Sequence, residues 1–198
     1  MSSQNKRKSM GKEEVQNVSL EDNRIIYING DFTEEMAKEV FEKIVTLEIS
    51  NPRKDILLMI DSYGGYVHSY LAIHDAIMLS RCNVATFCIG KAMSCGQLLL
   101  TSGAKGKRFA SKNSRIMMHE ISSMSWGKLT DMEVDLNESK ELQKIVNRLT
   151  EDYTGLSKSK IKKLLEKDSF LSAEEAKNLG IIDHVVENRD DLYKRINL

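Results

Sequence analysis

The chain has 198 residues, of which 41% are hydrophobic and one is proline, a composition typical of a globular domain and unlike a disordered or loop-rich chain. Its 29 Lys and Arg residues balance its 29 Asp and Glu residues, so no global charge favours nucleic acid as a partner. No segment combines the length and apolarity of a signal peptide or a membrane span, so we expect a soluble cytoplasmic protein that does not bind membranes.

The cysteines and histidines give no sign of a metal site. The three cysteines are odd in number, and neither they nor the four histidines show paired metal-ligand spacing. We therefore expect free thiols in a reducing compartment, with no metal ion and no other cofactor.

From residue 24 onward, apolar runs that predict strands alternate with segments of helical periodicity. In chain order, the sequence predicts a strand over 24–28, a helix over 34–51, a strand over 56–60, a helix around 71–77, a strand over 84–89, a helix over 97–101, and strands over 108–110 and 115–118. Turns are expected at Asn29-Gly30 and over 61–65, where glycines follow the first two strands. This alternation favours an α/β fold whose parallel sheet is built from right-handed crossovers.

The segment over 130–153 differs from the rest, because it is long and highly charged and carries few apolar residues. A helix of this length spans roughly 36 Å, which is more than a small domain needs to cover its sheet, so we expect it to project as an arm. Two further helices are predicted after it, one over 156–167 and one from a capping box at Ser172 to Gly180.

Ser94 lies between the third predicted strand and the helix over 97–101, in the stretch GKAMSCGQ. Its surroundings are similar to the G-x-S-x-G elbow that exposes a nucleophilic serine, with Ala92 in place of the first glycine. Serine is also among the commonest residues at the start of a helix, and taken alone the position favours a helix cap.

A nucleophilic serine needs a base, and His119 is the best-placed of the four histidines. It directly follows the strand over 115–118, and the carboxyl ends of parallel strands meet at one edge of a sheet. His68 and His74 are expected on a helix surface or in a groove, and His184 follows no such strand. Position alone leaves a structural role for His119 open.

Five motifs together resemble the ClpP family, the proteolytic subunits of the Clp proteases. In chain order they are Ser62–Gly65, Gly90–Gly96, Gly103–Phe109, Asn113–His119 and Asp168–Ala173. They occur in the order and spacing of the family, and the resemblance extends from about residue 23 to residue 186.

The resemblance implies an α/β, ClpP/crotonase-like fold with stacked parallel βα units and a projecting handle helix. We expect the handle within about 120–155. We also expect a flexible N-terminal segment over 1–19, followed by a single peptidase domain over 20–198.

The resemblance also implies a serine peptidase with a catalytic triad. Ser94 matches the nucleophile, His119 the general base, and Asp168 the acid that orients the histidine. The backbone N–H groups of Gly65 and Cys95 match the oxyanion hole. Sequence physics alone does not identify Asp168, because a carboxylate at the end of a charged helix is usually just solvated.

Other positions depart from the family pattern. A strand expected after His119 lacks the proline and glycines that are usual there, which implies a different peptide preference. The residues expected to line the substrate groove are Gly64, Ile121, Ser122 and Ser123. Tyr63 replaces a proline, and Leu57 and Met59 stand where the family's partner-docking cleft often has tyrosines. Residues 1–19 show no recognisable pore-loop pattern.

The resemblance implies a homo-oligomer of two stacked seven-membered rings with interdigitating handles, acting on peptides and unfolded proteins. The implied partner is an AAA+ unfoldase of the ClpX, ClpA or ClpC type, with neither nucleic acid nor a membrane involved. Two alternatives stay open. One is a non-catalytic ring subunit that assembles with an active paralogue, and the other is an acyl-CoA hydratase or isomerase of the crotonase type.

Overall fold

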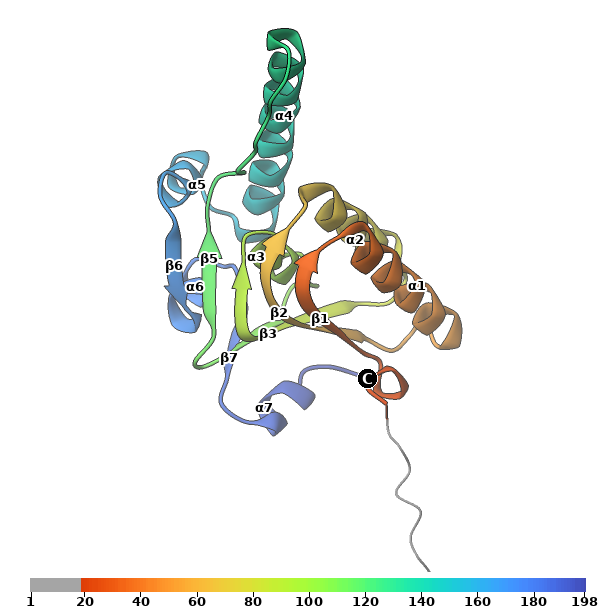
Figure 1. Cartoon of the computed structure of the whole chain (residues 1–198). Coiled ribbons are helices and arrows are strands. Elements are labelled where there is room, and N and C mark those ends of the chain that lie inside the picture. The colour runs from red at the N-terminus through yellow and green to blue at the C-terminus, as the bar shows by residue number, and fades with distance from the viewer. Residues whose placement is uncertain (1–18) are drawn as a thin grey trace, which may run out of the picture.

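A computed structural model describes residues 19–198, so the segment expected to be flexible over 1–19 lies, except for Ser19, outside the described residues. After a short 3-10 helix at Glu21–Asn23, the elements in chain order are β1 (Ile25–Phe32), α1 (Glu34–Ser50), β2 (Ile56–Gly65), α2 (Val67–Leu79), β3 (Val84–Met93), α3 (Cys95–Thr101), β4 (Arg108–Ser111), β5 (Arg115–Met118), α4 (Leu129–Thr154), α5 (Lys158–Leu165), β6 (Ser169–Ser172), α6 (Ala173–Asn178), β7 (His184–Val186) and α7 (Arg189–Tyr193). The predicted α/β fold is confirmed (Figure 1).

The sheet is mostly parallel and divides at β3. One path runs in the order β1-β2-β3-β4-β7, and every pair along it is parallel. β3 pairs with β4 through Thr86–Cys88 and with β5 through Lys91–Met93, so its second half turns to a different neighbour. β6 then adds to β5 as the one antiparallel strand among the described residues, a strand that the sequence does not predict. This division places β5 beside the end of β3, where Ser94 follows.

The first three strands run further than predicted. Asn29-Gly30 does not end β1, which continues to Phe32, and the predicted turn over 61–65 is instead the last part of β2. Gly30 and Gly64 have φ of 92° and 112°, values that other residues rarely adopt, and the strand register shifts beside both. The glycines therefore bend the strands without ending them.

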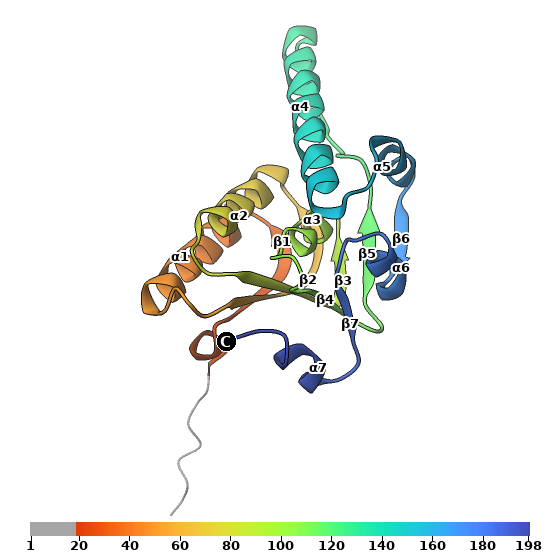
Figure 2. The same ribbon diagram turned by 180° about the vertical axis from the view of Figure 1, so that it is seen from behind.

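Two apolar layers lie on opposite sides of the sheet. On one side α1, α2 and α3 cover β1 to β3, with Ile44, Ile73 and Leu99 fully buried between them (Figure 2). On the other side α7 and the C-terminal residues cover a smaller cluster that contains Leu57 and Phe87. Helices α1 to α3 thus cover one face of the sheet, and α7 with the C-terminal residues covers part of the other.

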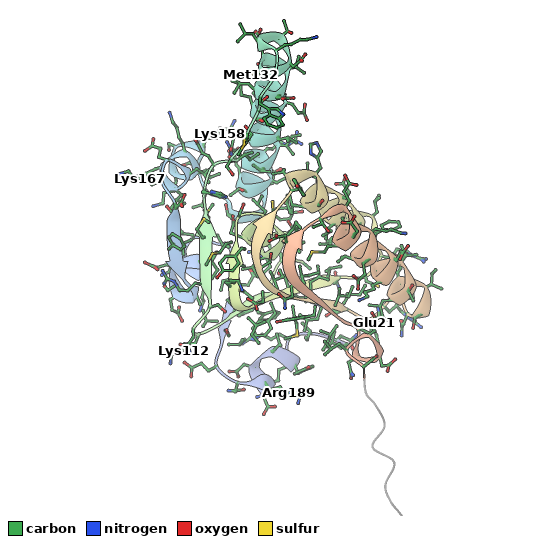
Figure 3. All side chains as sticks on the ribbon, viewed as in Figure 1. Glu21, Lys112, Met132, Lys158, Lys167 and Arg189 are labelled. Atoms are coloured by element: carbon green, nitrogen blue, oxygen red, sulfur yellow. The ribbon has the colours of Figure 1, made fainter. Side chains whose placement is uncertain are left out.

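The predicted long helix is α4, one residue longer at each end, and it projects from the body in both views (Figures 1 and 2). Val146 and Thr150 are buried at its base. Its first half makes an outer end, on which Figure 3 labels Met132 and on which Val134 and Leu136 are exposed. Of the helices in residues 19–198, none has the length and apolarity to cross a membrane.

The segment over 120–127, where a strand was expected, forms no strand. It runs along α4 instead, and the backbone N–H of Ile121 donates to Oε1 of Gln143 at 2.7 Å. The other predicted helices are present, including the capping box between Ser172 and Glu175.

Candidate active site

Ser94 forms a strained elbow between β3 and α3. Its φ of 53° and ψ of −122° lie outside the regions that residues with a side chain normally adopt, and its hydroxyl makes no capping hydrogen bond. The helix-cap interpretation is therefore wrong. Two hydrogen bonds hold the elbow, from Ser94 N to Met117 O at 3.0 Å and from Leu98 N to Ser94 O at 3.1 Å.

Gly64 leaves room for this elbow. A Cβ atom at Gly64 would lie 2.7 Å from Cβ of Ser94 and 3.0 Å from the carbonyl oxygen of Met93. Because both of these neighbours belong to the elbow, the end of β2 can approach Ser94 so closely only with glycine at this position.

His119 reaches the Ser94 hydroxyl directly. Its Nε2 atom lies 2.8 Å from Oγ of Ser94, and the imidazole is about three-quarters buried. The parallel pairing of Met93 with Met117 brings the two residues together, because each follows the carboxyl end of its strand. A hydroxyl and an imidazole at this distance are arranged for transfer of the serine proton to nitrogen.

Asp168 lies on the other side of His119, with a looser geometry. Its Oδ1 atom is 3.9 Å from Nδ1 of His119, which is too long for a hydrogen bond, and its side chain is 64% exposed. The antiparallel pairing of Met118 with Ser169 carries it there from the loop between α5 and β6. The three residues that resemble a triad are thus gathered, with the carboxylate at ion-pair distance only.

Gly65 and Cys95 bring two backbone N–H groups to the same edge. Cys95 is the first residue of α3, and the N–H groups in the first turn of a helix have no partner within that helix. Gly65 ends β2 with φ of 147°, and a Cβ atom on it would collide with the backbone of Phe32. The N–H of Cys95 is thus free of a partner within α3, and Gly65 occupies a backbone position that only glycine fits.

The Cys95 side chain links these two positions. Its Sγ atom donates to the carbonyl oxygen of Gly65 at 3.2 Å. Burial raises the pKa of the Cys95 thiol to about 11, so the thiol stays protonated and able to donate at neutral pH.

A cleft opens beside Ser94 between α3, α4 and the residues that follow β5. Its lining contains Gly65, Val67, Ser94, Cys95, Gln97, Leu98, Met118, His119, Glu120, Ile121, Ser122, Gln143, Val146, Asn147, Thr150 and Leu165. Of the four residues expected to line a groove, Ile121 and Ser122 line this cleft, whereas Gly64 and Ser123 do not. Gly64 packs under the elbow, and Ser123 lies further along the exposed segment.

Sequence reasoning missed the contribution of α4 to this cleft. Gln143, Asn147 and Thr150 line the cleft together with Ser94, and Gln143 Nε2 donates to Asn147 Oδ1 at 2.8 Å. Their spacing of four and then three residues places them on one face of the helix, around the buried Val146. In the sequence, these three polar residues around the apolar Val146 were the pattern that could have indicated a cleft-lining face on this helix.

The other histidines are held elsewhere. His74, expected on a surface or in a groove, is buried, and its Nε2 lies 2.9 Å from the hydroxyl of Tyr153. His184 stacks on Phe109, and His68 is exposed near Glu138. His119 is thus the histidine that lies beside Ser94.

A scan against models of known protein families matches the Clp protease model over residues 9–189. The match includes every strand from β1 to β7, together with the long helix α4. It therefore contains the elbow, His119 and Asp168.

Proposed function

The chain belongs to the Clp protease family, and from that premise we propose that it is a serine endopeptidase acting on peptides and unfolded proteins. One observation carries the proposal, the 2.8 Å contact between Ser94 Oγ and His119 Nε2 on a backbone elbow that makes no helix cap. A strained serine that is hydrogen-bonded to a base is typical of an activated nucleophile.

In the proposed reaction, Ser94 Oγ attacks the carbonyl carbon of the scissile peptide bond while His119 Nε2 takes its proton. The N–H groups of Gly65 and Cys95 stabilise the oxyanion that forms, each contributing about 10²–10³ in rate. His119 then gives the proton to the leaving amine. Water hydrolyses the acyl-enzyme by the same steps, with His119 again as the base, and releases the second product.

Asp168 stabilises the imidazolium that His119 becomes. At 3.9 Å it acts through its charge, and it would fix the tautomer of His119 only after moving close enough to accept a hydrogen bond from Nδ1. We propose that assembly into the oligomer supports this closer position.

We further propose a homo-oligomer of two stacked seven-membered rings joined through α4, with an AAA+ unfoldase as partner. The outer half of α4 supports the assembly, because Val134 and Leu136 are 67% and 51% exposed and lie on a helix whose buried residues, Val146 and Thr150, are at its base. An isolated polar helix of this length gains little from its own domain.

A second candidate function is a non-catalytic ring subunit. The observation that favours it is the open geometry of Asp168, which leaves His119 without a hydrogen-bonded acid. Membership of the Clp protease family disfavours the alternative of a crotonase-type acyl-CoA enzyme.

Labelling with a fluorophosphonate probe tests the peptidase proposal. We expect covalent labelling of the wild type and none of Ser94→Ala, because the probe requires an activated serine. A chain that assembles but takes up no label would instead be the non-catalytic subunit.

A further inference from the structure

A second groove adjoins the cleft beside Ser94. It lies between α4 and α5, which pack against each other at the base of α4 (Figure 1), and has a volume of about 520 Å³. Its lining consists of Glu120, Lys144, Asn147, Arg148, Glu151, Lys158, Ile161, Lys162 and Leu165, here called the α4–α5 groove. Glu120, Asn147 and Leu165 line both spaces, so a chain held beside Ser94 can continue into this groove.

The groove is positively charged although the whole chain is neutral. Its lining carries four cations and two carboxylates, namely Lys144, Arg148, Lys158, Lys162, Glu120 and Glu151. The cations come from two pairs spaced four residues apart, one on α4 and one on α5, so each pair lies on one helix face. Ile161 and Leu165 are buried between these faces and form the apolar floor.

Three of the four cations lack an acidic partner within the described chain. Lys144 lies 2.6 Å from Glu141, whereas across residues 19–198 no carboxylate oxygen lies within 4.0 Å of the charged groups of Arg148, Lys158 or Lys162. Their positive charge is therefore available to a ligand.

We propose that the α4–α5 groove binds acidic side chains of the substrate and selects peptides with Asp or Glu a few residues from the scissile bond. The proposal rests on the proposed peptidase function and adds a substrate class to it. The guanidinium of Arg148 can hold a carboxylate through two parallel hydrogen bonds, and Lys158 and Lys162 add charge from the opposite wall. Glu120 stands at the junction of the two spaces and repels an acid placed there, so the favoured acid lies beyond it.

A second acidic chain could compete for the groove, namely the outer half of α4 from another copy. That segment carries four acids and no Lys or Arg over residues 129–139: Asp131, Glu133, Asp135 and Glu138. The continuity of the groove with the cleft beside Ser94 favours the substrate, and the test separates the two.

Binding to the Ser94→Ala variant provides a test that does not need hydrolysis. Two fluorescent peptides that differ only by Glu or Gln at positions a few residues from the scissile bond are titrated in low and in about 0.5 M salt. We expect the Glu peptide to bind about 3- to 10-fold more tightly at low salt, since a few partly exposed charge pairs contribute modestly. The preference should disappear at high salt, where charges are screened beyond roughly 4 Å.

Matched charge reversals on α4 and α5 locate the effect. Lys162→Glu and Arg148→Glu, each combined with Ser94→Ala, should abolish or invert the preference. Lys160→Glu and Lys163→Glu change the net charge equally but do not line the groove, and the preference should survive in both. Glu120→Gln should increase the preference.

The outcomes are distinct. Equal affinity for the Glu and Gln peptides would overturn the proposal, even if the wild type hydrolyses both peptides. The same holds if the Glu preference is lost equally in all four charge-reversal variants, two of which lie outside the groove. A binding preference without hydrolysis by the wild type would support the groove and remove the proposed peptidase function. Dissociation of the particle in Lys162→Glu with an unchanged Glu/Gln ratio would assign the groove to another copy and overturn the proposal.

Discussion

The two sides of His119 are built differently. Toward Ser94, the contact is a 2.8 Å hydrogen bond, held by β2, β3 and β5 and by a glycine that fits under the elbow. Toward Asp168, the separation is 3.9 Å, and the carboxylate belongs to an exposed loop before an edge strand. The buried sheet thus fixes the proposed nucleophile and base within one chain, whereas the proposed acid depends on a surface segment. Substitutions on the two sides of His119 should therefore differ in how much activity they remove and in how strongly that loss depends on assembly of the oligomer.

The largest effect is expected on the serine side. Ser94→Ala should abolish peptide hydrolysis while leaving assembly intact, and His119→Ala should lose nearly as much, because the two residues act as a unit. Steady-state hydrolysis of a fluorogenic peptide measures both, with sedimentation as the check on assembly. A Ser94→Ala variant that keeps more than a tenth of wild-type turnover would remove Ser94 as the nucleophile.

Gly64→Ala should reduce turnover by on the order of 100-fold, because its Cβ would push against Ser94 at 2.7 Å and displace the hydroxyl from His119. The positive φ adds about 1–3 kcal/mol of backbone strain. Gly106→Ala is the matched control, since Gly106 also has a positive φ but no atom within 4 Å of the added Cβ. Comparable loss of activity in both variants would mean that backbone strain alone is responsible.

Asp168→Asn should cost about 10- to 100-fold in kcat. A buried, hydrogen-bonded acid in this role can be worth about 10⁴, and the exposed Asp168 makes no such bond. The measurement is kcat of the assembled variant. A loss as large as that of His119→Ala would indicate that the acid closes onto the histidine in the working oligomer, against the open geometry described here.

The difference between the two sides of His119 also bears on which parts of the fold and site could be predicted from the sequence. Strand and helix order follows from apolar periodicity, and the resemblance pointed to Ser94, His119 and Asp168, but the local physics of each residue left other roles open. The backbone angles of Ser94 exclude a helix cap, and such angles depend on packing against β2 and β5, which are distant from Ser94 in sequence. β6 escaped prediction because it has four residues, and its partner β5 lies more than fifty residues earlier.

Introducing a charged residue on the outer half of α4 should split the proposed double ring into single rings. The accompanying loss of activity should be no larger than the loss caused by Asp168→Asn. Val134→Glu and Leu136→Glu are the suitable changes, since both side chains are exposed, whereas Leu149 packs against the core and a charge there would disturb the fold. Sedimentation reports the assembly. If assembly supports only the position of Asp168 beside His119, the double variant Leu136→Glu/Asp168→Asn should lose little more turnover than Asp168→Asn alone. Full additivity would show that assembly also acts on the serine side.

The smallest effect is expected from the Cys95 thiol. Cys95→Ala removes the hydrogen bond to the Gly65 carbonyl, and a bond of this kind is worth about 0.5–1.5 kcal/mol, or roughly a 2- to 10-fold change in rate. We expect the loss in kcat with KM nearly unchanged, because the oxyanion forms only in the transition state. Cys95→Ser, which keeps a donor, should recover most of the rate.

Cys88→Ala separates this role from the loss of a buried thiol. Cys88 is equally buried in β3, and burial raises its pKa to about 11 as well, but its thiol makes no hydrogen bond to Gly65. Both alanine variants should therefore lose thermal stability, and only Cys95→Ala should lose kcat. Because the Cys95 thiol stays protonated below a pKa of about 11, its contribution should be constant between pH 6 and 9. Parallel losses of kcat in the two variants, or a Cys95→Ser variant no better than Cys95→Ala, would mean that packing alone fixes the oxyanion hole.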